Sequence, residues 1–558
     1  MCGIFALCNY NDSYSKNNIH LIEESFNKGK NRGPEFSILK QVSIQLQFGF
    51  HRLAINGINN ESNQPLQYKN ISLICNGEIY NYKELYRYLN VTPTTDSDCE
   101  IIIHLYIKFG INDTLKLLDG VFAFLLLDND NGELFVGRDP YGVRPLFFFQ
   151  NNGLLGFASS VGMLKELSKD QIFHFPPGNY MKLILPHIIS AKWQVNERVK
   201  YHNHPFSIIA KHENVNFYEI FQNIRNLLTQ AVYKRCSTSD RPIACLLSGG
   251  LDSSLIASLV NQYHKINNLP KLETYCIGIK GSVDIENAEK VAKFLDTNHY
   301  SIIVSEEDFI NAIPEVIKTI ESYDTTTVRA SIGNYLVAKY ISENSQAKVI
   351  FSGEGSDELT GGYLYMNQAP NCIEFDLECK RLLTHIYNYD VTRCDKSISS
   401  HGLEARVPFL DRNFVQYYLS LPKNIRYRTG EFPEFKYYKF CEKFLLRKAF
   451  ESSCLLPEDI LWRTKEAFSD GVSGQRKSLF EIIQDKLAYL ELTHSYTHNP
   501  PQTKEQLYYR NIFEENFPNQ SHIIPYFWMP RFIEANDPSA RTLQIYKESN
   551  TELQERSL

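Results

Sequence analysis

The pattern of apolar and polar positions changes near the middle of the chain. Residues 1 to about 185 hold short apolar runs separated by turns rich in Gly, Asn and Asp, and such runs predict strands. The predicted strands are 42–50, 71–75, 121–128 and 134–137. A helix is predicted over 98–109, with Asp98 as its N-cap or first-turn acid. These elements favour a layered α+β domain dominated by strands.

From about residue 216, apolar strands alternate with helices. Strands are predicted over 242–247, 274–279, 299–304 and 348–352, and helices over 253–260 and 285–295. This alternation predicts an α/β domain with a parallel sheet, followed by a mainly helical part from about 365 to 490.

The stretch from about 186 to 215 is polar and has little periodicity, which predicts a linker. We therefore expect a first domain at 2–190, a linker at 191–215 and a second domain at 216–558.

Composition and charge narrow the class of protein. The 558 residues are 43% hydrophobic and 22% charged, with a net charge of −6, which gives no electrostatic reason to expect nucleic acid or an anionic membrane as a partner. No apolar run reaches the roughly 18 residues that span a bilayer, and the N-terminus lacks the pattern of a signal peptide. The twelve cysteines are scattered without a CxxC pair, so we expect reduced thiols and a cytoplasmic protein.

The cysteine at position two is the first candidate nucleophile. If Met1 is removed, the thiol of Cys2 and a free α-amino group lie on the same residue. An α-amino group has a pKa of roughly 8 and can act as the base that activates a nucleophile. Taken alone, a chance cysteine at this position explains the sequence at least as well.

Polar residues elsewhere in the first half fit the other needs of an amino-acid amide. The guanidinium of Arg52 can bind a carboxylate through two parallel hydrogen bonds. The amide of Asn76 and the backbone N–H of Gly77 can hold a tetrahedral oxyanion. Glu78 and Asp98 can pair with an ammonium group.

Four segments of the first half resemble the glutaminase domain of class II glutamine amidotransferases: 1–4, 32–34, 76–81 and 137–146. The resemblance implies an N-terminal nucleophile (Ntn) fold in which Cys2 is the nucleophile and Asn76 and Gly77 form the oxyanion hole. It also implies a glutamine site made of Arg52, Leu53, Ala54, Ile55, Asn56, Asn76, Gly77, Glu78 and Asp98. Asn31 and Glu35 depart from the family, which usually has His and Asp there.

A glycine-rich loop between a predicted strand and helix is the first candidate for nucleotide binding. Ser248, Gly249, Gly250, Asp252 and Ser253 lie in the sequence SGGLDSS. The glycines let backbone N–H groups point at an anion, the helix N-terminus adds a favourable dipole, and Asp252 can hold Mg²⁺. An ordinary βα turn with a Ser N-cap is the alternative. The loop resembles the pyrophosphate-binding loop of ATP pyrophosphatases, which cleave ATP to AMP and PPi.

A second loop follows the strand at 348–352. The sequence SGEGSDE carries three carboxylates and two glycines, which suits a Mg²⁺–phosphate site, although alone it would be a solvated acidic turn. Lys465 can neutralise phosphate but by itself would belong to a surface loop.

Together with these loops, segments 323–331, 404–411, 465–471 and 537–542 resemble asparagine synthetases. The resemblance implies an ATP-pyrophosphatase (adenine nucleotide hydrolase-like) domain that uses glutamine, aspartate, ATP and Mg²⁺. It places Leu246, Ser248, Gly249, Gly250, Asp252, Ser253, Ile277, Ser352, Gly353 and Lys465 around ATP. Asp252 and Asp357 then bind Mg²⁺–PPi, and Glu354 assists the adenylated intermediate or a proton transfer. Ser160 departs from the family, which usually has Glu there.

Two other functions stay open at this level. The acceptor could be another acid, as in relatives that close a β-lactam ring, although the matches at 323–331 and 465–471 argue against this. A non-catalytic regulator is the second alternative, but every predicted catalytic position is intact. Whether the chain forms a homodimer is also open.

Overall fold

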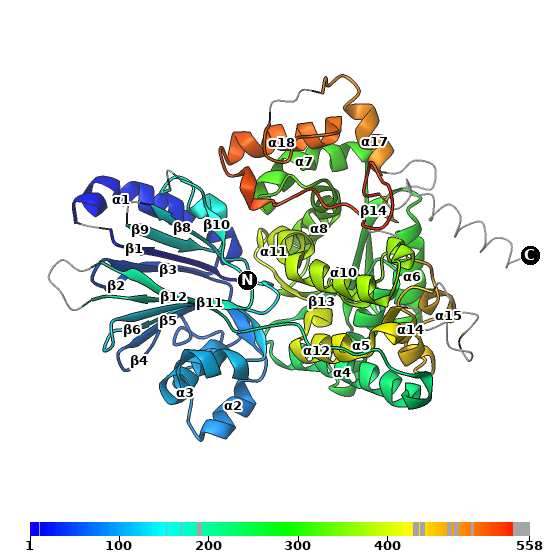
Figure 1. Ribbon diagram of the computed structural model, residues 1–558, viewed down its shortest axis with the longest axis horizontal. Coiled ribbons are helices and arrows are strands. Elements are labelled where there is room, and N and C mark those ends of the chain that lie inside the picture. Colours follow the sequence, from blue (N-terminus) through cyan, green and yellow to red (C-terminus); the bar gives the residue numbers. More distant parts are fainter. Residues whose placement is uncertain are drawn as a thin grey trace, which may run out of the picture.

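The computed structural model describes residues 1–539 apart from 11, 152, 169, 187–191, 428–434, 436–440, 466–470, 474–478 and 493–495. Two halves lie side by side (Figure 1), a strand-rich first half and a larger second half built around a five-stranded sheet. The chain passes from one half to the other after residue 200.

The first half contains two six-stranded sheets. The first sheet has the order β10 (Phe173–His174), β8 (Phe147–Asn151), β9 (Leu154–Ala158), β1 (Gly3–Cys8), β3 (Leu46–Arg52) and β2 (Phe36–Ser43). The second has the order β12 (Gln194–Lys200), β11 (Asn179–Ile184), β7 (Glu133–Arg138), β6 (Gly120–Asp128), β5 (Ile71–Ile79) and β4 (Leu66–Tyr68). All their strand pairs are antiparallel.

Successive side chains of each strand point to opposite faces of its sheet, and apolar residues occupy both faces. The inner faces of the two sheets therefore pack against each other. Ile4 and Phe50 from the first sheet share a core with Leu125 and Val136 from the second. The outer face of the first sheet packs on helix α1 (Asp12–Asn27), and that of the second on α2 (Tyr82–Leu89) and α3 (Ile101–Leu117). The result is a helix, sheet, sheet, helix arrangement, which agrees with the predicted layered α+β domain.

Two local predictions in this half need correction, and of the two roles predicted for Asp98 one is confirmed. Residues 42–50 are not one strand, because the chain turns at Ile44 and Gln45 between β2 and β3, and Gln45 has φ of +55°. The predicted linker contains β12, which pairs with β11 and so belongs to the second sheet. Ser97, not Asp98, caps the turn before α3, and Asp98 is a first-turn acid.

The second half holds a parallel sheet with the order β15 (Asn298–Val304), β14 (Glu273–Ile279), β13 (Ile243–Leu246), β16 (Val349–Phe351) and β17 (Glu404–Arg406). The parallel α/β prediction is therefore confirmed. From β13 the chain builds outward through β14 and β15, and then returns to the other side of β13 as β16. Such a reversal leaves a crevice at the carboxyl ends of the two central strands, where ligands bind in this class of fold.

Helices surround this sheet and form most of the later part of the chain (Figure 1). They are α4 (Phe217–Ser237), α5 (Leu251–Ile266), α6 (Val283–Leu295), α7 (Glu306–Ile320), α8 (Thr325–Asn344), α9 (Ser356–Thr360), α10 (Cys372–His385), α11 (Asp390–Ser399), α12 (Arg412–Ser420), α13 (Lys423–Tyr427), α14 (Phe444–Glu451), α15 (Glu458–Leu461), α17 (Leu479–Lys486) and α18 (Lys504–Asn516). Among the described residues, none of the helices has the length and apolar character to cross a bilayer.

The two halves share one apolar core. Met1, Tyr80 and Val143 from the first half pack in the same cluster as Leu403 and Val407 from the second. Buried ion pairs also cross the boundary, including Arg144 with Glu404 at 3.5 Å. This joint surface fixes the relative position of the two predicted sites.

Candidate active sites

Cys2 lies just before β1 and is half-buried. Its Sγ donates to the backbone carbonyl of Leu53, at 3.6 Å, at the end of β3. Burial raises the pKa of the Cys2 thiol, and the neighbouring terminal amine and Arg52 oppose that rise. The thiol therefore needs a base to become a nucleophile.

The predicted oxyanion-hole residues lie in β5. Asn76 is fully buried, and neither its Oδ1 nor its Nδ2 has a hydrogen-bond partner among the residues that the structure describes. A buried amide without partners costs free energy, and such groups are kept where a ligand completes them. At Gly77, a Cβ would lie 2.5 Å from the carbonyl oxygen of Val121 on the paired strand β6, so no larger residue fits.

Arg52 ends β3 and points into the loop that follows. Its Nη1 donates to the carbonyl of Asn59 and to Oδ1 of Asn63, both at 2.7 Å, and its Nη2 donates to the carbonyl of Gly57. These acceptors are neutral, and the described residues place no carboxylate in an ion pair with Arg52. The guanidinium thus orders the loop while its charge stays available for a substrate carboxylate.

The predicted ammonium-binding carboxylates are close to each other and buried. Glu78 accepts a hydrogen bond from Nδ2 of Asn56 and lies 3.3 Å from Nη2 of Arg406. Asp98 accepts the backbone N–H of Ile79 at 2.6 Å. Burial raises the pKa of Asp98 to about 6, and burial together with Glu404 and Asp98 raises the pKa of Glu78. An ammonium group would lower both values by pairing with the ionised forms.

The segment after Arg52 connects this site to the second half. Glu35, where the family usually has Asp, accepts the backbone N–H of Ala54 at 2.7 Å and pairs with Arg241 at 2.8 Å. Arg241 also donates to the carbonyl of Ala54 at 2.9 Å. Leu53 and Ile55 are buried in the shared core. The predicted glutamine-binding residues therefore lie on β3, on β5 or in the segment after β3, except Asp98, which reaches β5 from the turn before α3.

The two glycine-rich loops of the second half meet at the carboxyl ends of β13 and β16, which are neighbouring parallel strands. A Cβ on Gly353 would lie 2.9 Å from the backbone nitrogen of Ser253, so the loops are in contact. Within the first loop, Oγ of Ser248 and Oγ of Ser253 are 3.0 Å apart. Helix α5 begins immediately after Gly250 and directs its N-terminus at the same place.

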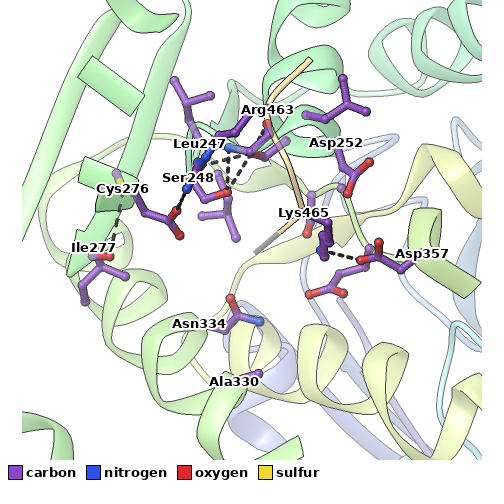
Figure 2. Close-up of a pocket in the computed structure, with 18 of the residues that line it drawn as sticks. Leu247, Ser248, Asp252, Cys276, Ile277, Ala330, Asn334, Asp357, Arg463 and Lys465 are labelled. Atoms are coloured by element: carbon purple, nitrogen blue, oxygen red, sulfur yellow. Dashed lines mark hydrogen bonds and ion pairs between the residues drawn. The ribbon is translucent and has the colours of Figure 1, made fainter. Parts of the chain in front are cut away.

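Both loops line one pocket (Figure 2). The predicted residues that line it are Leu246, Ser248, Gly250, Asp252, Ser253, Ile277, Ser352, Gly353, Glu354, Asp357 and Lys465. Gly249 is behind the lining: it has φ of +71°, and its carbonyl accepts Nη1 of Arg463 at 3.0 Å. Residues 466–470 of the predicted lysine loop and 540–542 of the predicted C-terminal segment lie outside the described residues.

Two lysines and two aspartates form a charge network in this pocket. The buried Nζ of Lys443 is 2.5 Å from Oδ2 of Asp252 and 2.6 Å from Oδ1 of Asp357. The Nζ of Lys465 is 2.6 Å from Oδ2 of Asp357, as Figure 2 shows. Burial alone would raise the pKa of Asp357, but the two ammonium groups outweigh it and hold that pKa well below its usual range. The two predicted metal ligands therefore already face one shared cation.

Glu354 points to another part of the pocket. It forms an ion pair with Arg393 of α11, with Oε2 and Nη2 2.6 Å apart, and Arg393 also pairs with Asp390. Burial raises the pKa of Glu354 although Arg393 opposes the rise. A raised pKa makes an ionised carboxyl a better proton acceptor.

Sequence reasoning missed Lys443, Arg393 and Asn334. Asn334 lines the pocket from α8, and its buried Nδ2 has no hydrogen-bond partner in the structure (Figure 2). These residues stand far from the glycine-rich loops in sequence, on helices or next to one. No local signal marks Lys443 or Arg393, because each stands among other charged residues in the sequence.

Comparison with known proteins finds one matching family model in each half of the chain. A model described as glutamine amidotransferase domain matches residues 1–200, and one described as asparagine synthase matches 223–376 and 373–530. These define the class: a glutamine amidotransferase domain joined to an asparagine synthase domain.

The relatives narrow the class further. The glutamine-hydrolysing asparagine synthetase of Gallus gallus is 43% identical over 574 residues and covers 98% of this chain and 99% of its own. The Homo sapiens protein is 41% identical over 573 residues with the same coverage. The chain therefore belongs to the glutamine-hydrolysing asparagine synthetase family.

Proposed function

We propose that this chain is a ligase that makes asparagine from aspartate, ATP and ammonia released from glutamine. The observation that carries the proposal is the second pocket, where two glycine-rich loops, two aspartates and two lysines converge. Triphosphate binding uses backbone donors, cations and carboxylates that can hold Mg²⁺, and groups of these three kinds line the pocket.

In the first half, we propose that Cys2 attacks the side-chain amide of glutamine. Ammonia leaves, and water then releases glutamate from the thioester. The unpaired amide of Asn76 and the N–H of Gly77 would hold the oxyanion. Arg52 would bind the α-carboxylate, and Glu78 and Asp98 the α-ammonium group. These contacts suit an Ntn-type amidotransferase, the fold that the family resemblance implies.

The base in this mechanism is the α-amine of Cys2, so we propose that Met1 is removed. With Met1 in place, the terminal amine belongs to Met1, is buried, and donates to the carbonyl of Leu403 at 3.2 Å. Mass spectrometry of the active protein should find a chain beginning at Cys2. An active glutaminase that keeps Met1 would contradict this step.

In the second half, we propose that ATP occupies the pocket with its phosphates on the loop at 248–253. The backbone of Leu246 and Ile277, together with Ser352 and Gly353, would surround the nucleotide. The residues fit Mg²⁺, because Asp252 and Asp357 already direct one oxygen each at a common cation, the ammonium of Lys443. Mg²⁺ is commonly held by one or two carboxylates together with substrate phosphates.

The proposed reaction has two steps. A β-carboxylate oxygen of aspartate attacks the α-phosphorus of ATP, and PPi leaves to give β-aspartyl-AMP. Ammonia then attacks the acyl carbon, AMP leaves, and a proton is lost to a base. Glu354 is our candidate for that base, and Lys465 for stabilising phosphate charge. Water must be kept out because it would hydrolyse the acyl-adenylate.

The acceptor distinguishes this function from its nearest alternatives. We expect AMP and PPi to form only when aspartate is present with ATP and Mg²⁺. AMP formation with another acid, and not with aspartate, would favour a different acceptor. No AMP under any condition would favour a non-catalytic protein.

Cellular location, boundaries and assembly stay predictions. All twelve cysteines are free, and we propose a cytoplasmic enzyme because free thiols suit a reducing compartment.

We propose a domain boundary near residue 200, after β12, in place of 190. A homodimer is testable by light scattering.

A further inference from the structure

Helix α11 lies at the boundary between the two halves, close to the N-terminus of the chain (Figure 1). Most of its residues are buried, and several are charged. Its buried charged side chains therefore need polar or charged partners. These partners lie towards both candidate active sites.

Towards the first half, α11 binds Arg32. The Nη2 of Arg32 lies 2.9 Å from Oδ2 of Asp395, and its Nη1 donates to Oγ of Ser399 at 2.9 Å. Asp395 and Ser399 are four residues apart and so lie on the same face of the helix. The remaining Nε of Arg32 donates to the backbone carbonyl of Cys2 at 3.0 Å. The guanidinium thus connects the synthetase half directly to the residue that carries the nucleophile.

Towards the second site, the same helix presents Arg393, which pairs with Glu354. Residues two positions apart in an α-helix are separated by about 200° around the helix axis. Arg393 and Asp395 therefore face nearly opposite directions. The helix therefore lies between the two candidate active sites. Asp395 binds Arg32 on the side of the first site, and Arg393 binds Glu354 in the second.

We propose that Asp395 is a positioning residue for Cys2, acting through Arg32, so that α11 completes the glutaminase site from the synthetase half. This inference rests on the proposed role of Cys2. The hydrogen bond from Arg32 fixes the backbone carbonyl of Cys2 from the side of the synthetase half, and a displacement of about 1 Å can cost on the order of a hundredfold in rate. Asp395 also lies 3.6 Å from Nη1 of Arg144, which strengthens the same boundary.

The test is steady-state kinetics on the full chain with Asp395→Asn. We expect kcat for glutamine hydrolysis to fall roughly tenfold to a hundredfold with little change in KM, because the nucleophile and not the substrate is displaced. Asparagine formation from ammonium should stay near the original rate, which also shows that the variant is folded. In an Arg32→Lys background, Asp395→Asn should cost far less than in the original chain, because the two residues act as one unit.

Glu321→Gln is the matched control. Glu321 is another buried acid at the boundary that contacts α11: it pairs with Lys396 and accepts the N–H groups of Val161 and Gly162, just after Ser160. It does not touch Arg32. We expect this variant to lower the melting temperature and to leave glutaminase kcat unchanged.

Three outcomes would overturn the inference. They are an unchanged glutaminase kcat in Asp395→Asn, an equal fall in Glu321→Gln, and full additivity with Arg32→Lys. If Asp395→Asn fails to fold, Ser399→Ala decides. It removes the hydrogen bond from Arg32 and a longer one, at 3.5 Å, to the carbonyl of Lys396, keeps every charge, and should lower kcat in the same direction. If the original chain hydrolyses no glutamine, the proposed function itself fails.

Discussion

The two sites differ in how their polar groups are satisfied before substrate arrives. In the first half, the described residues give the buried amide of Asn76 no hydrogen-bond partner, and those that bind Arg52 are neutral acceptors. In the second half, Asp252, Asp357, Lys443 and Lys465 neutralise one another. The first site is thus prepared for charge that develops during the reaction, whereas the second must exchange its internal ion pairs for Mg²⁺ and phosphate.

This difference has an energetic consequence. Removing an unpaired group from the first site should cost activity but little stability. Removing a charge from the second leaves its partner buried and unpaired, so it should cost both. Variants that break this contrast would show that the sites have been assigned incorrectly.

The largest effect is expected in the second site. Asp252→Asn should abolish PPi release, because it removes a proposed metal ligand and leaves Lys443 with one carboxylate. Glutamine hydrolysis should largely remain. A PPi assay checks this, with Asp296→Asn as the control, since Asp296 forms an exposed ion pair with Lys271. Full PPi release by Asp252→Asn would show that the loop at 248–253 does not bind the nucleotide.

In the first site, Asn76→Ala should lower kcat for glutamine hydrolysis by roughly 10²–10³, the usual loss for one oxyanion-hole donor. Its melting temperature should not fall, because the lost amide has no partner. Gln64→Ala is the control: Gln64 is a buried amide that bonds both backbone groups of Cys75, so it should lose stability and keep activity. The reverse pattern would make Asn76 a structural residue.

Arg52→Ala should have a smaller effect. A guanidinium–carboxylate contact contributes about 1.5–3 kcal/mol, so kcat/KM for glutamine should fall roughly tenfold to 150-fold. Ammonia-supported synthesis should hardly change. Asn63→Ala removes a loop contact of Arg52 without removing the charge. If it reproduces the whole effect, Arg52 acts through the loop and not on the substrate.

The smallest effect concerns pH. The pKa of Asp98 is raised to about 6, so this carboxyl takes up a proton and loses its charge as the pH falls through 6. Glutamine binding should therefore weaken about tenfold from pH 7 to pH 5. Calorimetry on a Cys2→Ala variant measures this without turnover. A variant that also carries Asp98→Asn should bind glutamine equally at pH 7 and pH 5. If Cys2→Ala alone shows the same lack of pH dependence, Asp98 does not bind the ammonium group.

The sequence predicted the parts of the sites that have a local signature. The loops at 248–253 and 352–358 are recognisable because Gly, Ser and Asp follow a buried strand directly, and both line the pocket. Cys2 is recognisable by its position directly after Met1, and Asn76 by the Gly that follows it.

What sequence reasoning missed depends on tertiary contacts. Lys443 reaches Asp252 across 191 residues and Arg393 reaches Glu354 across 39, and no local pattern encodes such distances. The β2–β3 turn was missed because Ile44 is apolar and Gln45 is not a typical left-handed residue, although it has φ of +55°. The strand β12 is polar and mostly exposed, so it lacks the alternation that would have marked it within the predicted linker.

The most direct test of the two-site account is asparagine formation by Cys2→Ala at pH 8. With glutamine as the nitrogen source, this variant should make no asparagine, because the only proposed nucleophile is gone. With ammonium salt, ATP, Mg²⁺ and aspartate, it should still make asparagine, faster at higher pH as more NH₃ is present. No asparagine from ammonium, in a folded variant that still binds ATP, would contradict the division of labour between the two halves.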